Sequence, residues 1–262
     1  MLVEQRRSRL LELVRSRRFA TLPELAEALA VSESTIRRDV EQLEEQGSAR
    51  RFHGGVLYAG TSPMLPHFEA RQETRWEQKK TIAEWTANLI EDGDTVLLDG
   101  GSTTYEVARL LVGRPLHVLT NSLPVANLFA SDANSDLVMV GGNICPRTGV
   151  AQGPLADQMI ASLRVRKTVL SVAAVHEEGF FNDNLMLVQT ERTMMKAADR
   201  VIVVVDSSKF GRQSLVRLCG LSAVQTLVVD DGIDQPWRER LTAAGVDLRV
   251  AQPVSPQENG TS

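Results

Sequence analysis

The sequence predicts two domains: an N-terminal winged helix-turn-helix domain, α-helical with a small β wing, and a larger C-terminal α/β domain. Two observations lead to this fold class. Near the start, two short helical segments are followed by a basic strand, a glycine turn and an apolar strand. From residue 71 onward, helix and strand signals alternate, and several strands are continuous runs of Val, Leu and Ile. Such runs are typical of a parallel sheet covered by helices on both faces.

A first helix is expected over residues 3–16. Its apolar positions predict an inward face, and its arginines predict an outward face that is solvated or touches a DNA backbone. The residues expected inward are Val3, Leu10, Leu11 and Val14. Those expected outward are Arg6, Arg7 and Arg9.

The stretch over residues 22–40 reads as a helix, a tight turn and a second helix. Thr21 and Glu24 have capping-box spacing, and Ser32 is placed to cap the second helix. In the second helix, one face is apolar through Ile36, Val40 and Leu43. The opposite face is polar and carries Ser34, Arg37, Arg38 and Glu41. A helix that holds two arginines and small hydroxyls outward is suited to reading a major groove.

The next segment, SARRFHGGVLY, predicts a two-stranded wing after a helix end at Gly47. Its basic residues are expected beside the phosphate backbone, where contacts set the register of the protein on DNA. The bland alternative is an ordinary helical hairpin with a solvated basic edge. The candidate DNA-binding residues are Ser32, Ser34, Thr35, Arg37, Arg38, Arg50, Arg51 and His53.

Composition limits the other classes of function. The 262-residue chain carries a net charge of −4, so DNA binding depends on where arginines are placed rather than on a basic excess. The two cysteines and four histidines show no metal-ligand spacing, and we expect no metal, cofactor or catalytic residue. No apolar run reaches membrane-spanning length, so a cytoplasmic protein without a membrane partner is expected.

In the second part of the chain, strands are expected near 95–98, 116–119, 137–140, 168–172, 201–205, 226–229 and 246–250. Ligands of open parallel sheets bind at the carboxyl ends of strands. There the sequence places the loop DGGSTTYE, the tripeptide TNS, a GG pair and the loop DSSKFG. Glycines and a helix N-terminus suit a phosphate. The alternative for the first loop is that Thr103 and Glu106 form a capping box and need no ligand.

The runs VSESTIRRDVEQLEEQG and ARRFHGGV resemble the DNA-binding signature of the DeoR family of bacterial transcriptional regulators. The K-x-x-IA motif at Lys79, the DGGSTT loop, TNS, GG and D-x-SKFG resemble its sensor domain. That resemblance implies a ribose-5-phosphate isomerase-like sugar-phosphate-binding fold. It also implies an effector pocket bordered by Lys79, Asp99, Gly101, Ser102, Thr103, Thr104, Asn121, Gly153 and Lys209. For Lys79, pairing with a carboxylate is an alternative, and for Glu191 and Lys196 structural ion pairing is preferred.

The expected function is a DeoR-type regulator, a repressor of sugar or carbon catabolism genes. It binds double-stranded operator DNA as a homo-oligomer and responds to a phosphorylated sugar or related metabolite. One alternative is an isomerase-like enzyme using Asp99, Glu106 or Asp183 as a base. Another is a DNA-binding factor without a ligand. The expected domains are 1–58 for DNA binding, 59–70 as a linker, 71–251 for the effector and oligomer contacts, and 252–262 as a disordered tail.

Overall fold

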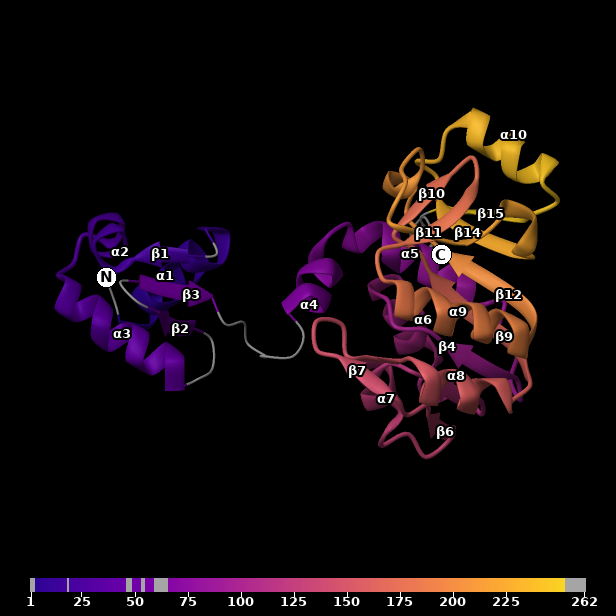
Figure 1. Cartoon of the computed structure of the whole chain (residues 1–262), viewed down its shortest axis with the longest axis horizontal. Helices are drawn as coiled ribbons and strands as arrows, with labels where there is room; N and C mark the ends of the chain where they lie inside the picture. The colour runs from indigo at the N-terminus through magenta and orange to yellow at the C-terminus, as the bar shows by residue number, and fades with distance from the viewer. Residues whose placement is uncertain (1–2, 18, 46–48, 53–54, 59–65, 253–262) are drawn as a thin grey trace, which may run out of the picture. The chain divides into compact units, whose positions relative to one another are not determined.

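The computed structural model describes residues 3–17, 19–45, 49–52, 55–58 and 66–252, shown in colour in Figure 1. The chain divides into two compact units, Met1–Glu69 and Ala70–Ser262. Gly47, His53 and the expected tail from residue 253 lie outside the described residues. Residues 66–70, expected as the end of the linker, belong to helix α4 (Pro66–Glu73).

The first unit contains the predicted helices and wing. Helices α1 (Val3–Arg17), α2 (Leu22–Leu29) and α3 (Glu33–Glu45) are followed by strands β2 (Ala49–Phe52) and β3 (Gly55–Tyr58). The sequence analysis missed β1 (Phe19–Thr21), which pairs antiparallel with β3 and gives the sheet order β1-β3-β2. Three residues are too few to show an alternating pattern, so this strand left no signal.

Two caps set the turn between α2 and α3. The Thr21 side chain accepts a hydrogen bond from the Glu24 backbone, and the Glu24 side chain accepts one from the Thr21 backbone, which confirms the capping box. Helix α2 ends at Ala30, whose φ of 52° is left-handed. The Ser32 hydroxyl accepts from the Thr35 backbone at 3.3 Å, as predicted for the cap of α3.

The core of the first unit includes Leu10, Val14, Ile36, Val40 and Leu43, which are buried as predicted. The assignment of α1 needs two corrections. Val3 is exposed, and Leu11 is only half-buried. Arg6 and Arg7 do not point into solvent, because both side chains bind the buried carboxylate Asp39 of α3.

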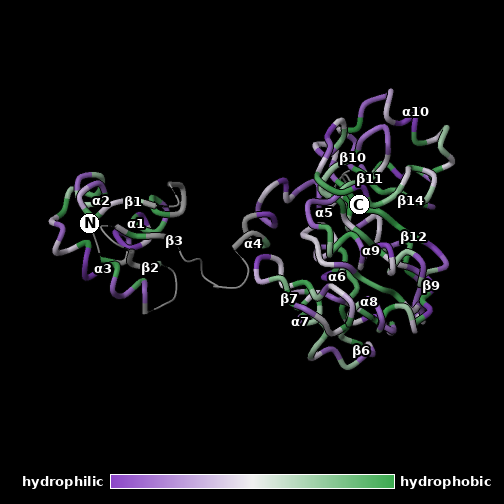
Figure 2. The backbone as a smooth tube through the Cα atoms, viewed as in Figure 1, coloured by the Kyte–Doolittle hydropathy of each residue, from purple (hydrophilic) through white to green (hydrophobic). Residues whose placement is uncertain are grey.

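The second unit is built on a parallel seven-stranded sheet in the order β15-β14-β12-β9-β4-β5-β6. All seven strands were predicted, with ends that agree or differ by at most three residues. Their bounds are β4 Thr95–Leu98, β5 His117–Thr120, β6 Asp136–Met139, β9 Val165–Ser171, β12 Ala198–Val204, β14 Thr226–Asp230 and β15 Asp247–Ala251. Figure 2 shows hydrophobic residues along these strands, as expected for a sheet buried on both faces.

Helices cover both faces of this sheet. One hydrophobic cluster packs α5 (Trp76–Ala87), α6 (Ser102–Leu111) and α7 (Leu123–Phe129) against it. A second cluster packs α8 (Pro154–Ala161), α9 (Leu185–Ala197) and α10 (Gln235–Ala243), and Figure 1 shows α8 and α9 in front of the strands. The domain is therefore a three-layer α/β fold.

Two smaller sheets were not predicted. Strands β7 (Asn143–Cys145) and β8 (Val150–Gln152) form a hairpin, and β10 (Ala174–His176), β11 (Gly179–Asn182) and β13 (Val216–Cys219) form a three-stranded antiparallel sheet. Their strands are three or four residues long and lie within loops rich in polar residues. Short 3-10 turns, η1 (Ser207–Lys209) and η2 (Leu221–Ala223), complete the unit.

The strand order reverses direction at one place. From β4 the chain adds β5 and then β6 on one side, and it later adds β9, β12, β14 and β15 on the other. In doubly wound sheets, the crevice at the carboxyl ends of the strands where the order reverses is the usual ligand site. Here that crevice lies beyond Leu98 and Ser171.

Among the described residues, no helix is both long enough and apolar enough to span a membrane.

Candidate DNA-reading helix and effector pocket

The outer face of α3 has the composition predicted for a DNA-reading surface. Ser34, Arg37, Arg38 and Glu41 are all exposed. The opposite face is buried against α1 and α2, so the helix is held by its apolar side. The two arginines are consecutive and exposed, so they can reach base edges in a major groove or the phosphates that border it.

The start of α3 carries a group of hydroxyls. The Ser32 hydroxyl lies 2.8 Å from that of Ser34 and 2.9 Å from that of Thr35. Helix N-termini attract phosphates because their backbone N–H groups point outward. This cluster is therefore suited to a contact with a DNA phosphate, which would fix the position of α3 on the DNA.

In the wing, Arg50 pairs with Leu57 and Arg51 with Val56 across strands β2 and β3. This pairing gives the antiparallel ladder predicted from the sequence. The side chains of Arg50 and Arg51, together with all of His53, lie outside the described residues, so their proposed DNA contacts stay predictions.

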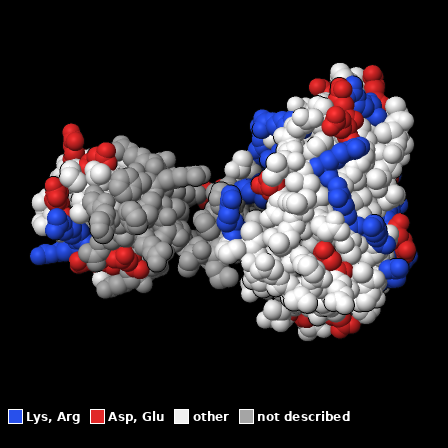
Figure 3. Space-filling view, in the orientation of Figure 1, with Lys and Arg blue, Asp and Glu red and all other residues white. Residues whose placement is uncertain are grey.

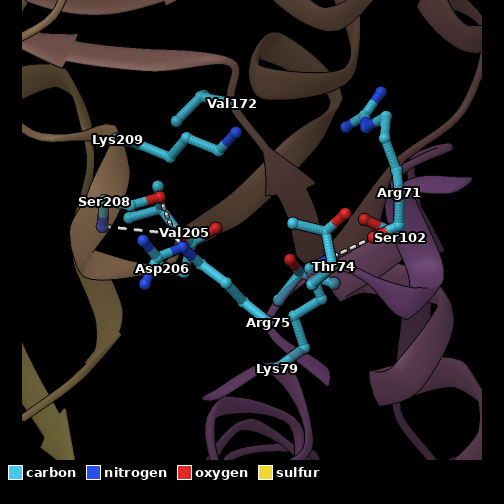
Figure 4. A pocket seen from close by; sticks show the side chains of 11 residues that line it. Arg71, Thr74, Arg75, Lys79, Ser102, Val172, Val205, Asp206, Ser208 and Lys209 are labelled. Carbon is cyan, nitrogen blue, oxygen red and sulfur yellow. Dashed lines mark hydrogen bonds and ion pairs between the residues drawn. The ribbon is translucent and has the colours of Figure 1, made fainter. Parts of the chain in front are cut away.

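In the second unit, a small pocket lies at the reversal point of the sheet. Its volume is about 100 Å³. It is formed by the turn between α4 and α5, the start of α6, the end of β9, and the segment from β12 into η1. Figure 4 shows Asp206, Ser208 and Lys209 on one side and Arg71, Thr74 and Ser102 on the other. The lining residues are Arg71, Thr74, Arg75, Lys79, Ser102, Thr103, Val172, Val205, Asp206, Ser208 and Lys209.

Cations dominate this pocket. The lining includes four cationic residues, Arg71, Arg75, Lys79 and Lys209, and the carboxylate of Asp206. Arg75 Nε lies 3.8 Å from Asp206 Oδ1, and Arg75 has a left-handed φ of 54°, a conformation that side chains rarely adopt. The excess of positive charge favours an anionic ligand.

Lys79 is the buried cation of the set. Its ammonium group donates to the backbone carbonyls of Arg71 and Thr74, so it closes the turn between α4 and α5. Burial lowers the pKa of Lys79 to about 8, and the charge of Asp206 opposes this effect. Lys79 makes no ion pair with Asp206 in the described structure, so carboxylate pairing is not its main role.

The N-terminus of α6 opens onto the pocket through Ser102 and Thr103. The capping box of Thr103 and Glu106, which was the alternative to a ligand site, is not formed. The N-cap is Gly101, and no side chain caps the helix, while Glu106 pairs with Arg109 at 2.9 Å. The first backbone N–H groups of α6 are thus left for a ligand, as a phosphate site requires.

Gly101 also fixes the position of this loop. A Cβ atom at Gly101 would lie 1.8 Å from Ser171 Oγ. Only a glycine lets the loop after β4 approach the end of β9 this closely. This is a physical reason for the GG pair in DGGSTT.

Behind the pocket lies a buried polar cluster made of Asp99, Thr104, Asn121, Ser171, Asn182 and Glu191. Glu191 accepts a hydrogen bond from Asn182 Nδ2 at 2.6 Å, and Asn121 Nδ2 donates to the Ala151 carbonyl at 3.1 Å. The structural ion pairing preferred for Glu191 is not what the structure shows, because Glu191 is fully buried in this cluster and is hydrogen bonded to the Asn182 amide.

Both carboxyl groups of the cluster hold their protons more tightly than usual. Burial raises the pKa of Asp99 to about 6, and the Gly100 backbone and the Asn121 amide partly offset that rise. Burial and then the charge of Asp99 raise the pKa of Glu191 well above its ordinary value. The pocket and the cluster are adjacent, because Gly101 packs against Ser171 and the residues that follow them, Ser102 and Val172, line the pocket.

The structure thus divides the predicted effector residues. Lys79, Ser102, Thr103 and Lys209 meet in the pocket. Asp99, Thr104 and Asn121 are buried behind it, beside Gly101. Gly153 lies outside the pocket lining; it caps α8, and its backbone N–H donates to the Thr190 hydroxyl at 3.1 Å.

Sequence reasoning missed Arg71, Thr74 and Arg75 as pocket residues. They precede the K-x-x-IA motif by only a few residues, but nothing in their spacing distinguishes them from a solvated helix end. Val172 is the last residue of a predicted strand, and Asp206 and Ser208 stand in the D-x-SKFG motif, so a search of strand ends finds these three.

Figure 3 shows how charged side chains are distributed over one face of the second unit. On the face of the second unit seen in Figure 3, basic and acidic side chains are both scattered. On this face the second unit is therefore not uniformly basic.

A DNA-reading helix with a wing, joined to an α/β unit with an anion pocket, defines the class of ligand-responsive transcriptional regulators. Family models agree. The model of the DeoR-like helix-turn-helix domain matches residues 6–61, and that of the DeoR C terminal sensor domain matches residues 74–231. The chain belongs to the DeoR family of transcriptional regulators.

Curated relatives align over almost their whole length. The HTH-type transcriptional regulator YulB of Bacillus subtilis is 32% identical over 89% of this chain and 91% of its own. The HTH-type transcriptional repressor CsqR of Escherichia coli is 31% identical, with 94% and 95% covered. The Glycerol-3-phosphate regulon repressor of Escherichia coli is 32% identical, with 86% and 90% covered. These relatives are regulators and not enzymes, which confirms that assignment for this chain.

Among solved structures, a ribose 5-phosphate isomerase A from Methanocaldococcus jannaschii aligns with a TM-score of 0.39 and 19% identity. The alignment covers 52% of this chain and 55% of that chain.

Proposed function

We propose that this regulator represses genes of sugar or carbon catabolism and that a phosphorylated sugar or related metabolite modulates its operator binding. The observation that carries the proposal is the pocket at the reversal point of the sheet. It combines four cationic side chains with the uncapped N-terminus of α6, which is a suitable environment for a phosphate group.

The names of relatives support the class of regulated gene. One relative is named for the glycerol-3-phosphate regulon, and another is the Putative aga operon transcriptional repressor of Escherichia coli. A further relative, from Haemophilus influenzae, is named as the L-fucose operon activator. Repression is the favoured direction because most of the named relatives are repressors.

The protein acts as a homo-oligomer on double-stranded DNA in the bacterial cytoplasm. Helix-turn-helix proteins commonly bind two half-sites about 34 Å apart, and two copies of α3 are needed to read them. The ligand needs to favour one state of the oligomer by only about 1–3 kcal/mol to change operator affinity some 5- to 150-fold.

The decisive experiment measures binding of the full-length chain to DNA upstream of its own gene, with and without a panel of phosphorylated sugars. We expect sequence-specific binding that at least one compound weakens. Lys209→Ala removes a pocket cation and is expected to abolish the response while leaving DNA binding unchanged. Specific binding that no compound alters, with no phosphorylated compound bound, would contradict the effector proposal.

A further inference from the structure

Among the described residues, the three large hydrophobic side chains that are most exposed lie close together on the second unit. Leu215, Leu155 and Leu185 are 80%, 71% and 69% exposed, and Met186 beside them is 43% exposed. Single leucines on a protein surface are common, but a contiguous group of them marks an interaction surface. These four residues are called the apolar patch below.

The packing of α8 against α9 brings most of the patch together. A Cβ atom at Gly153, the N-cap of α8, would lie 3.3 Å from Met186 Sδ in the first turn of α9. The Thr190 hydroxyl of α9 accepts from the Gly153 N–H at 3.1 Å and donates to Asp157 Oδ1 of α8 at 2.6 Å. The first turns of the two helices, which carry Leu155 and Met186, are therefore held side by side.

Leu215 reaches the same place from a third segment. It directly precedes Val216, which pairs with Asn182 at the end of β11. Leu185 begins α9 shortly after Asn182, so both leucines flank the same turn of the chain. Figure 1 shows α8 and α9 on the near side of the sheet, and Figure 3, in the same orientation, shows a broad area without charged side chains on this face.

The apolar patch has the size and surroundings of the centre of an interface. Three leucines and a methionine at these exposures fall in the range of about 300–600 Å² that the largest apolar patch of a typical monomer reaches. Each partner in a stable interface buries about 800 Å², with an apolar centre and a polar rim. Gln158 and Gln189, one helical turn after Leu155 and Leu185, are exposed and uncharged and can supply part of that rim.

We propose that the apolar patch is the surface by which two copies of this chain associate, with α8 and α9 of one copy facing the same helices of the other. The inference rests on the homo-oligomer of the proposed function and names the surface that forms it. In a twofold interface the same surface is used by both copies, so each residue lies near its own counterpart. Apolar side chains match themselves in this arrangement, whereas charges of one sign would repel each other.

Two other parts of the described chain fit this role less well. In the first unit, among the side chains whose exposure is described, Val3 is the one large hydrophobic residue that is exposed. It is too small a surface to cover the patch. The edge strand β15 carries Asp247, which forms ion pairs with Arg200 and Arg249, and charged side chains on an edge hinder its pairing with another chain. A second copy of the patch is therefore the occupant that the described surfaces favour.

Sedimentation equilibrium of the full-length chain measures the association. The main variant is Leu155→Glu/Leu185→Glu, which places like charges on both sides of a twofold contact. Both side chains are exposed and glutamate suits the first turn of a helix, so the second unit should melt as it does in the wild type. We expect the dissociation constant to rise at least about a hundredfold. Leu155→Gln/Leu185→Gln is a second, uncharged variant for the same readout.

Two further variants make the test specific. The control is Leu110→Glu, a change at an exposed leucine of α6 on the other face of the sheet, which should associate as the wild type does. The complementary variant is Leu155→Lys/Leu185→Lys. Alone it should associate as weakly as the glutamate variant, and a mixture of the two should recover association, because opposite charges then meet across the contact.

The outcomes separate the surface from the oligomer. A wild-type chain that associates, with the same dissociation constant in the glutamate and glutamine variants, overturns the patch as the interface and leaves the homo-oligomer in place. Glutamate and lysine variants that do not associate when mixed overturn the contact of the patch with itself. A wild-type chain that stays monomeric when it is bound to its operator overturns the homo-oligomer, and the inference with it.

Discussion

Arg6 of α1 holds Asp39 of α3 in a two-point contact. Arg6 Nε lies 2.5 Å from Asp39 Oδ2, and Arg6 Nη2 lies 3.2 Å from Asp39 Oδ1. Arg7 Nε adds a third contact, 3.0 Å from Asp39 Oδ1. Asp39 is 2% exposed and directly follows the two exposed arginines of α3. This contact fixes the rotation of the helix that presents Arg37 and Arg38.

The first prediction concerns this contact. Asp39→Asn removes the negative charge that pairs with Arg6 and Arg7. The two arginines are then left without a carboxylate partner, which lowers the stability of the folded state. We expect the melting temperature of the first unit to fall by about 5 °C, with weaker operator binding. Differential scanning calorimetry and operator titration measure both effects. Glu27→Gln, a change at an exposed residue of α2, is the control, and equal behaviour of the two variants would contradict the role of Asp39.

Acid should weaken the same contact. Burial raises the pKa of Asp39, but hydrogen bonds from Arg6 and Arg7 outweigh it and hold this pKa below its ordinary value. A carboxyl with a lowered pKa in the folded state stabilises the protein above its unfolded pKa of about 3.9. This stability is lost as the pH falls through the folded pKa. Thermal melts of wild type and Asp39→Asn should therefore converge below about pH 4, and a constant difference at acid pH would refute this.

Arg37→Ala tests base reading by α3. If the side chain reads a guanine edge, the change costs about 1–3 kcal/mol and relaxes specificity at one base position. Binding to a library of operator variants measures the specificity at each base position. The control is Arg109→Ala, which removes the same charge from an exposed arginine of the second unit. Equal losses on every sequence would make Arg37 a phosphate contact instead.

Because the pKa of Lys79 is lowered, we expect phosphate binding to depend on pH. Its pKa of about 8 means that the free protein loses this positive charge as the pH rises through 8. A phosphate favours the protonated form, so affinity should decrease above pH 8 by up to about tenfold per pH unit. Lys79→Arg, which stays charged, should flatten this dependence. Calorimetry with inorganic phosphate from pH 7 to 10 tests it, and an identical slope in both proteins would exclude Lys79 as the titrating group.

Gly101→Ala tests the close approach of the two loops. The added Cβ would lie 1.8 Å from Ser171 Oγ, so the loop after β4 must move. Overpacking of this kind costs about 1–3 kcal/mol, and the shifted loop should also weaken phosphate binding. Gly141→Ala is the matched control, since nothing lies within 4 Å of its added Cβ. Urea melts and phosphate titrations should distinguish the two variants, and equal effects would count against the contact.

Sequence patterns predicted elements that depend on local chemistry. The capping box of Thr21 and Glu24, the buried face of Ile36 and Val40, and all seven strands of the large sheet were correct. Each depends on residues close in sequence or on a continuous apolar run, whose signal does not need a distant partner.

Residues with ambiguous partners were misjudged. Arg6 was predicted to face outward because it lies on the polar side of α1. In the structure it pairs with Asp39, which is 33 residues away in sequence. Glu106 has capping-box spacing from Thr103, but it pairs with Arg109. Glu191 was expected to form a structural ion pair and is buried beside Asp99. A charged side chain can form hydrogen bonds or ion pairs with several partners, and the packing of the fold determines which partner it has.

The sequence by itself determined the two kinds of domain, the polar outer face of α3 and the loops where a phosphate is expected, because helix periodicity, apolar runs and glycine-rich turns are local properties. The tertiary structure decided what those loops make together. The reversal of strand order between β4 and β9 brings Lys79, Ser102 and Lys209 to one pocket and buries Asp99 and Glu191 behind it. Residues from distant segments come together in this way because of the order of strands in the sheet, and no single segment of the sequence encodes that order.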